Sequence, residues 1–105
     1  MSINFTKAIV NRLQREIADI ESKSMNERNK KEKAQSKINQ LQTDMKLSQS
    51  HSDLSSKMTR INKLNEDIKT INRLQADLSK QLVTKKASLK QHLAKEPQQE
   101  ETFDK

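Results

Sequence analysis

The spacing of apolar residues constrains this chain more than any other feature. In the first half they alternate three and four positions apart, which is the 3.5-residue period of a coiled-coil seam. The pattern predicts one helix over about residues 4–46, interrupted on its apolar face by three polar seam positions. The predicted seam consists of Val10, Leu13, Ile17, Ile20, Ser24, Glu27, Lys31, Ala34, Ile38, Leu41 and Met45.

The second half repeats this period and predicts a second helix over about residues 53–96. Its stripe is wider than a strict seam because Met58, Leu74 and Leu93 lie beside it, which is typical of a helix with more than one neighbour. The predicted seam consists of Leu54, Lys57, Ile61, Leu64, Ile68, Ile71, Gln75, Leu78, Leu82, Lys85, Leu89 and His92.

A cluster of short polar residues separates the two patterns and predicts a turn at about residues 47–52. Ser, His and Asp side chains bond to nearby backbone and favour turns and helix caps. Ser52 is the best N-cap candidate, with Asp53 in the first turn of the second helix. We expect Pro97 to end that helix, because proline lacks a backbone N–H. Residues 97–105 are then an acidic, disordered tail or the start of a linker.

Composition supports helices and excludes other fold classes. The 105 residues include no Gly and are only 30% hydrophobic, too little for a compact α/β or β-sandwich core. The fold predicted for residues 1–96 is therefore all-α, an antiparallel two-helix coiled-coil hairpin. With the turn near Gln49, Ile38 faces Ile61 and Ser24 faces Gln75. One continuous helix in a parallel dimer is the alternative.

The two seams are unbalanced, which favours self-association. Glu27 and Lys31 lie where the second helix offers Leu64, Ile68 and Ile71, so the first helix cannot bury all three. We therefore expect a homo-oligomer, with two hairpins forming a four-helix bundle. The predicted interface residues are Leu13, Ile17, Ile20, Ile38, Leu41, Leu54, Ile61, Leu64, Ile68, Ile71, Leu78, Leu82 and Leu89.

No constellation of residues indicates catalysis. There is no cysteine and no HExxH or EF-hand pattern, and His51 and His92 fall far apart in the predicted hairpin. Carboxylates such as Asp19 and Glu27 have Lys23 and Lys31 one helical turn away, as on a solvated helix surface. We predict a non-enzyme without metal or cofactor. The absence of a signal peptide pattern and of an apolar run of about 18 residues favours the cytoplasm and no membrane partner.

The basic charge leaves an alternative function open. The formal net charge is +7, but the excess is spread over both helices rather than gathered into a stripe, apart from the run RNKKEK at residues 28–33. Only Phe5 and Phe103 are available to stack on bases. A basic coiled-coil accessory protein that binds nucleic acid or a larger complex is therefore the second interpretation.

Two stretches resemble the N-terminal coiled-coil region of bacterial TIR (Toll/interleukin-1 receptor) domain proteins. They are MSINFTKAIVNRLQREIADIESK and SHSDLSSKMTRINKLNEDIKTINRLQADLSKQLVTKK, within residues 1–93. The cue is the Ser-rich break followed by Leu54, Ser56, Lys57, Ile61 and a Leu78-Ser79-Lys80 repeat.

The resemblance implies an assembly module for an immune effector. In that family the coiled coil precedes a TIR domain that cleaves NAD, often in antiphage defence, and self-assembly is linked to activity. No α/β pattern follows residue 93, so the resemblance assigns no catalytic or NAD-contacting residue here. The effector domain is expected either in the same polypeptide or in a separate one.

Overall fold

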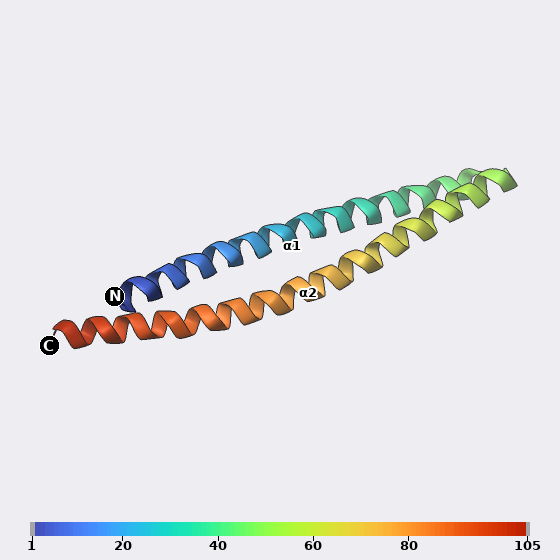
Figure 1. Cartoon of the computed structure of the whole chain (residues 1–105). Helices are drawn as coiled ribbons and strands as arrows, with labels where there is room; N and C mark the ends of the chain where they lie inside the picture. The colour runs from blue at the N-terminus through green and yellow to red at the C-terminus, as the bar shows by residue number, and fades with distance from the viewer. Residues whose placement is uncertain (1, 105) are drawn as a thin grey trace. The chain divides into compact units, whose positions relative to one another are not determined.

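The computed structural model describes the backbone of residues 2–104 and the side chains of residues 5–94. It contains two helices that pack against each other, α1 (Ser2–Leu47) and α2 (His51–Asp104), and no strand within the described backbone (Figure 1). The prediction of an all-α chain is confirmed. Because α1 and α2 are separated by residues 48–50, the alternative of one continuous helix is wrong.

Local interactions keep the long helices regular. The hydroxyls of Thr43, Thr59, Thr70 and Thr84 donate to the backbone carbonyl four residues earlier at 3.0–3.2 Å, so these β-branched residues are satisfied inside a helix. The ion pair between Lys23 and Asp19 (3.4 Å) is one of several that join residues one turn apart. Such exposed pairs each contribute about 0.2–0.5 kcal/mol. Packing between the helices supplies the larger share of helical stability.

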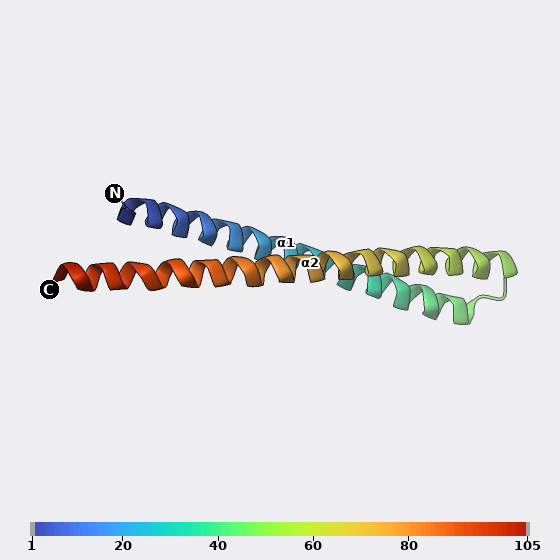
Figure 2. The ribbon, with the colours of Figure 1, turned by 60° about the horizontal axis from the view of Figure 1, so that its bottom comes forward.

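The chain divides into two compact units, each built from a piece of both helices. The turn unit comprises Ser24–Ala76, and the terminal unit comprises Met1–Lys23 with Asp77–Lys105. In each unit, the α1 and α2 segments run in opposite directions side by side (Figures 1 and 2). Each unit therefore has an antiparallel pairing of its own.

The core of the turn unit is a small aliphatic cluster. Ile38, Leu41 and Ile61 are 3%, 5% and 6% exposed, and Met45, Leu64 and Ile68 pack against them. Ile38 and Ile61 thus lie in one cluster, as expected for a turn near Gln49. Full burial of each such side chain is worth about 1.5–3 kcal/mol, which makes this cluster the main stabilising feature of the unit.

In the terminal unit, apolar packing is joined by ion pairs between the helices. Val10, Leu13, Ile17 and Ile20 of α1 and Leu78 of α2 are the buried apolar residues. Two ion pairs link α1 to α2: Lys85 Nζ lies 3.0 Å from Glu16 Oε1, and Lys86 Nζ lies 3.5 Å from Glu21 Oε2. All four side chains are at least one-third exposed, so solvent screens these pairs.

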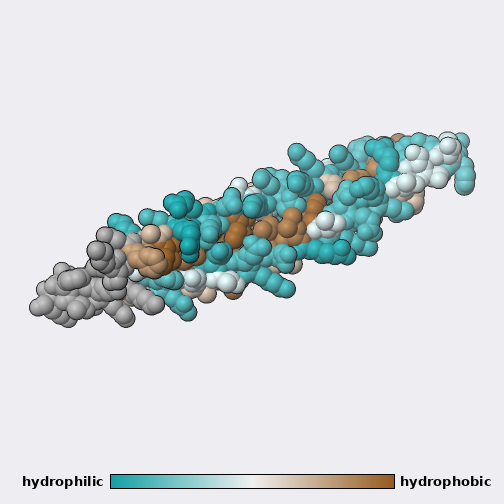
Figure 3. Space-filling view, viewed as in Figure 1, coloured by the Kyte–Doolittle hydropathy of each residue, from teal (hydrophilic) through white to brown (hydrophobic). Residues whose placement is uncertain are grey.

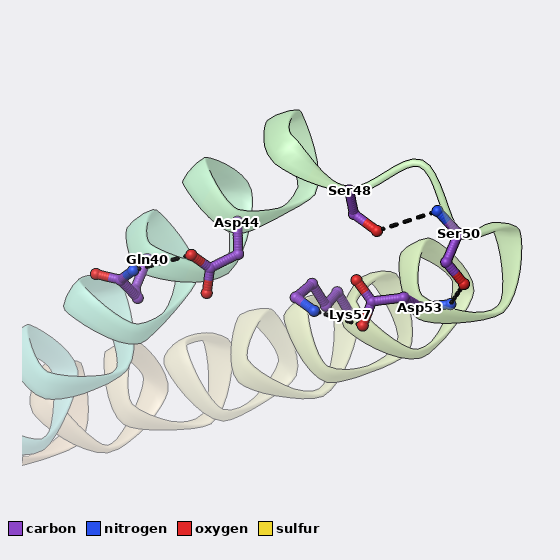
Figure 4. Close-up of polar contacts among 6 residues, drawn as sticks. All are labelled: Gln40, Asp44, Ser48, Ser50, Asp53 and Lys57. Atoms are coloured by element: carbon purple, nitrogen blue, oxygen red, sulfur yellow. Dashed lines mark hydrogen bonds and ion pairs between the residues drawn. The ribbon is translucent and has the colours of Figure 1, made fainter.

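The turn corrects the predicted start of the second helix. Asp53 N–H donates to Ser50 Oγ at 3.2 Å and Leu54 N–H donates to the Ser50 carbonyl at 3.0 Å, so the N-cap is Ser50 and not Ser52 (Figure 4). Ser48 Oγ in turn accepts from the Ser50 N–H at 3.3 Å. Ser50 has the advantage because Asp53 then occupies the third helical position, where its N–H needs an acceptor.

The second helix also extends beyond its predicted end. α2 continues through Pro97 to Asp104, so the expected disordered tail from residue 97 is helical over residues 97–104. Proline removes one backbone donor, but the residues that follow it include Gln98, Gln99, Glu100 and Glu101, which all have high helix propensity. Lys105 lies outside the described residues.

Candidate functional site

The apolar seam of α1 is covered by the chain itself. All of its predicted apolar positions except Met45 are 8% exposed or less, and Met45 is half-buried. These buried residues are Val10, Leu13, Ile17, Ile20, Ala34, Ile38 and Leu41. The α1 residues of the predicted interface are therefore already buried within the chain. Only other residues are accessible for direct contact with a second copy.

The apolar seam of α2 is covered incompletely. Of its predicted positions only Ile61, Ile71 and Leu78 are buried, at 6%, 8% and 5% exposed. We call the half-buried remainder the open α2 stripe, which consists of Leu54, Leu64, Ile68, Leu82 and Leu89. The prediction that α1 cannot bury all three of Leu64, Ile68 and Ile71 agrees with their burial, because Ile71 is buried and the other two are half-buried.

Ile71 is buried although a polar seam residue, Glu27, lines the same groove. The Glu27 side chain is only 12% exposed, and its carboxylate lies 2.9 Å from Lys30 Nζ. The carboxylate of Glu27 is directed to Lys30, so the burial of this side chain does not leave its charge without a partner. Its partner is thus Lys30 and not Lys31, as the spacing had suggested.

Four large apolar side chains of α2 outside its predicted seam are exposed. Met58, Leu74, Val83 and Leu93 of α2 are 47%, 42%, 69% and 40% exposed. On the face drawn in Figure 3, patches of hydrophobic surface are bordered by hydrophilic surface. Contiguous apolar surface rimmed by polar residues is typical of interaction sites.

The polar seam pair does not form a hydrogen bond. Ser24 and Gln75 are both half-buried in the turn unit, but no hydrogen bond joins them. Both positions lie at the chain boundary between the two units. The seam therefore weakens in apolar content where the units divide.

A groove in the turn unit lies beside the α1 positions that are polar, and we call it the lysine groove. Its volume is about 440 Å³, and its apolar lining comes from Ala34, Leu64 and Ile71. Three lysines of α1, Lys30, Lys33 and Lys37, also line it, as do Glu27, Asp67 and Thr70. The run RNKKEK at residues 28–33 was the only sequence signal near this groove, and it did not indicate which lysines share a face.

The charges of the lysine groove are not balanced. Lys30 is paired with Glu27, and Asp67 is paired with Lys63 at 3.0 Å. No carboxylate among the described side chains lies within ion-pair distance of Lys33 or Lys37. The groove therefore offers two uncompensated ammonium groups beside an apolar lining.

The pKa of Asp53, in the first turn of α2, is lowered from its ordinary value. A hydrogen bond from Lys57 Nζ, followed by one from the Ser48 hydroxyl and by the charge of Lys57, lowers the pKa of this carboxyl (Figure 4). The shift fits a structural role, because these partners hold the turn against the first turn of α2. It gives no indication of catalysis.

The described residues offer no arrangement for metal chemistry. They contain no cluster of three or more His, Cys, Asp or Glu side chains that could hold an ion. His92 Nδ1 lies 2.8 Å from the Ser88 carbonyl on its own helix, and His51 is exposed at the start of α2. Neither helix, over its described residues, has an apolar stretch long enough to cross a bilayer.

Comparisons with known proteins gave no relative: no protein-family model, curated protein or solved structure matches the chain. The resemblance to coiled coils of TIR-domain proteins accordingly stays a prediction. Any proposal about function depends on the surfaces described above.

Proposed function

We propose that this protein is a non-catalytic assembly module that self-associates through apolar surface on α2. The observation that carries the proposal is the difference in coverage between the helices. The apolar α1 seam is buried within the chain, whereas the open α2 stripe and four large α2 side chains are not. Apolar surface of this extent is stabilised when a second molecule removes it from water.

Two copies related by a symmetry axis would satisfy this requirement. In a bundle of two hairpins, the α2 helix of one copy packs on the α2 stripe of the other, at the spacing of a four-helix core. Leu82 and Leu89 of the terminal unit and Leu64 and Ile68 of the turn unit would then become fully buried. We propose a four-helix bundle of this kind as the working form.

The experiment is light scattering on the size-exclusion-purified full chain over a range of concentrations. We expect Met58→Glu and Leu74→Glu to shift the chain towards the monomer with little loss of helicity, because both side chains are more than two-fifths exposed. Ala87→Glu, at an exposed α2 position, adds the same charge and is the matched control. A wild-type monomer at tens of micromolar, or variants that assemble like the control, would overturn the proposal.

The burial of each α2 residue decides which substitutions are informative about association. Ile71 is 8% exposed, so Ile71→Glu would damage the packing of α1 on α2 as well as any oligomer. Leu74 follows Ile71 by three residues and is 42% exposed. Its substitution reports on association with less effect on folding.

We further propose that the assembled module brings effector domains together in the cytoplasm. Assembly raises the local concentration of whatever is attached, without any new contact to the effector. The sequence resemblance nominates a NAD-cleaving TIR domain, in the same polypeptide or in a partner. An adjoining or continuing reading frame with a TIR-type α/β pattern would support this assignment, and a frame with an unrelated domain would contradict it.

The unpaired Lys33 and Lys37 favour a second candidate function, the binding of nucleic acid. Phosphate contacts would make the affinity fall steeply with salt, about 0.9 log units per log unit of salt for each phosphate neutralised. Titration of labelled duplex DNA at two salt concentrations measures this directly. Binding that is lost in Lys33→Gln and Lys37→Gln variants would support this function over assembly alone.

A further inference from the structure

We infer that the lysine groove binds the acidic C-terminal segment of a second copy of this chain, residues 96–104. This inference rests on the proposed self-association and names the segment that makes the contact. It starts from the two uncompensated ammonium groups of Lys33 and Lys37 beside the apolar lining of Ala34, Leu64 and Ile71.

The positive charge of the lysine groove favours an acidic occupant. Lys33 and Lys37 have no carboxylate four residues before or after them on α1, so their own helix cannot neutralise them. Two copies that placed their lysine grooves face to face would bring like charges together, which opposes association. An acidic helical segment with an apolar residue satisfies both the charge and the lining.

The chain itself contains such a segment. Residues 96–104 read EPQQEETFD, with four carboxylates, no basic residue and one aromatic residue, Phe103. Glu96, Glu100 and Asp104 recur every four residues, the same spacing that separates Lys33 from Lys37. The backbone of this segment belongs to α2, and one helical turn rises about 5.4 Å, so carboxylates at this spacing match ammonium groups at this spacing.

The contact is of the helix-in-groove type. The groove volume of about 440 Å³ exceeds that of a phenyl ring, and its lining includes the half-buried Leu64 of the open α2 stripe. Occupation of the groove would therefore also cover part of the apolar surface that α1 leaves open. Apolar burial and paired charges then act together at one site.

The test uses charge reversal and complementation in the full chain, with assembly followed by light scattering. Variant A carries Lys33→Glu and Lys37→Glu, and variant B carries Glu100→Lys and Asp104→Lys. Each variant alone places like charges on both sides of the contact. We therefore expect the concentration at which half of the chains are assembled to be roughly tenfold or more above that of the wild type. An equimolar mixture of A and B restores opposite charges at every contact and should assemble like the wild type.

Controls separate this inference from the proposed self-association. Lys7→Glu with Lys90→Glu changes the net charge by the same amount as variant A at exposed positions outside the groove, and should assemble normally. Wild-type assembly that variant A leaves unchanged would overturn the groove contact alone. Loss in A and B without recovery in the mixture would also overturn it, whereas a monomeric wild type would overturn self-association itself.

Discussion

The two helices share a heptad period but differ in how far the chain covers them. On α1 the seam is narrow and its apolar residues from Val10 to Leu41 are 8% exposed or less. On α2 the stripe is wider, and Leu54, Leu64, Ile68, Leu82 and Leu89 stay half-buried. The narrow apolar face of α1 can cover only part of the wider apolar stripe of α2. The apolar face of α1 is therefore buried within the chain, whereas part of the α2 stripe is not.

The largest expected effect tests whether a more deeply buried residue contributes more to the free energy of unfolding. Ile38 is 3% exposed in the core cluster, and Ile38→Ala should lower the free energy of unfolding by about 2–5 kcal/mol. Ile68→Ala removes the same atoms from a half-buried site and should cost about half as much. Urea unfolding at a protein concentration low enough to keep the chain monomeric measures both. Equal losses would contradict the contrast between the helices.

A second substitution should reduce the difference in burial between the apolar faces of α1 and α2. Lys31 occupies a half-buried α1 seam position and has no ion pair among the described side chains. Lys31→Leu extends the apolar face of α1 opposite the open α2 stripe, and we expect a gain of about 1 kcal/mol in unfolding free energy. The same variant should self-associate less, because less α2 surface remains open. Lys30→Leu, which instead breaks the pair with Glu27, is the control and should not be stabilising.

The start of α2 offers a prediction about its cap. Ser50→Ala removes the oxygen that accepts the Asp53 N–H, and should lower the unfolding free energy by about 1 kcal/mol. Ser52→Ala should stay within about 0.5 kcal/mol of the wild type, because Ser52 is exposed and no described group bonds to it. Thermal unfolding of both variants distinguishes the cap observed from the one that the sequence indicated.

A smaller effect is expected where ion pairs join α1 to α2. Glu16 and Lys85 lie 3.0 Å apart and are 39% and 37% exposed. A double-mutant cycle with Glu16→Gln and Lys85→Gln should give a coupling of about 0.2–1 kcal/mol that declines at high salt. A coupling that is absent at low salt would show that this contact does not hold the helices of the terminal unit together.

The smallest effect concerns acid. The lowered pKa of Asp53 means that its contribution to stability is present above its unfolded pKa of about 3.9 and is lost as the pH falls through the lower folded pKa. Asp53→Asn should therefore be less stable than the wild type at neutral pH, and the difference should vanish in acid. Urea midpoints at pH 7 and below pH 3 measure the effect. A difference that persists in acid would mean that charge is not its source.

Much of the fold was readable from residue spacing, whereas the groove was not. Every predicted seam position, including polar ones such as Lys57 and His92, is buried or half-buried. The cap was predicted two residues late because Ser48, Ser50 and Ser52 are chemically equivalent in sequence and only geometry distinguishes them. The predicted end at Pro97 is too early, because residues of high helix propensity follow this one proline and α2 continues to Asp104.

The sequence by itself determined the helical class, the two seams and the surplus of apolar residues on α2, because a 3.5-residue period leaves only one way to align apolar side chains. Tertiary structure decided which of those residues remain open. It paired Glu27 with Lys30 in the groove that the buried Ile71 also lines, left Leu64 and Ile68 half-covered, and put Lys33 and Lys37 in the lining of that groove without an ion-pair partner among the described side chains. Coverage depends on where side chains of two helices meet in space, which the spacing along either helix does not specify.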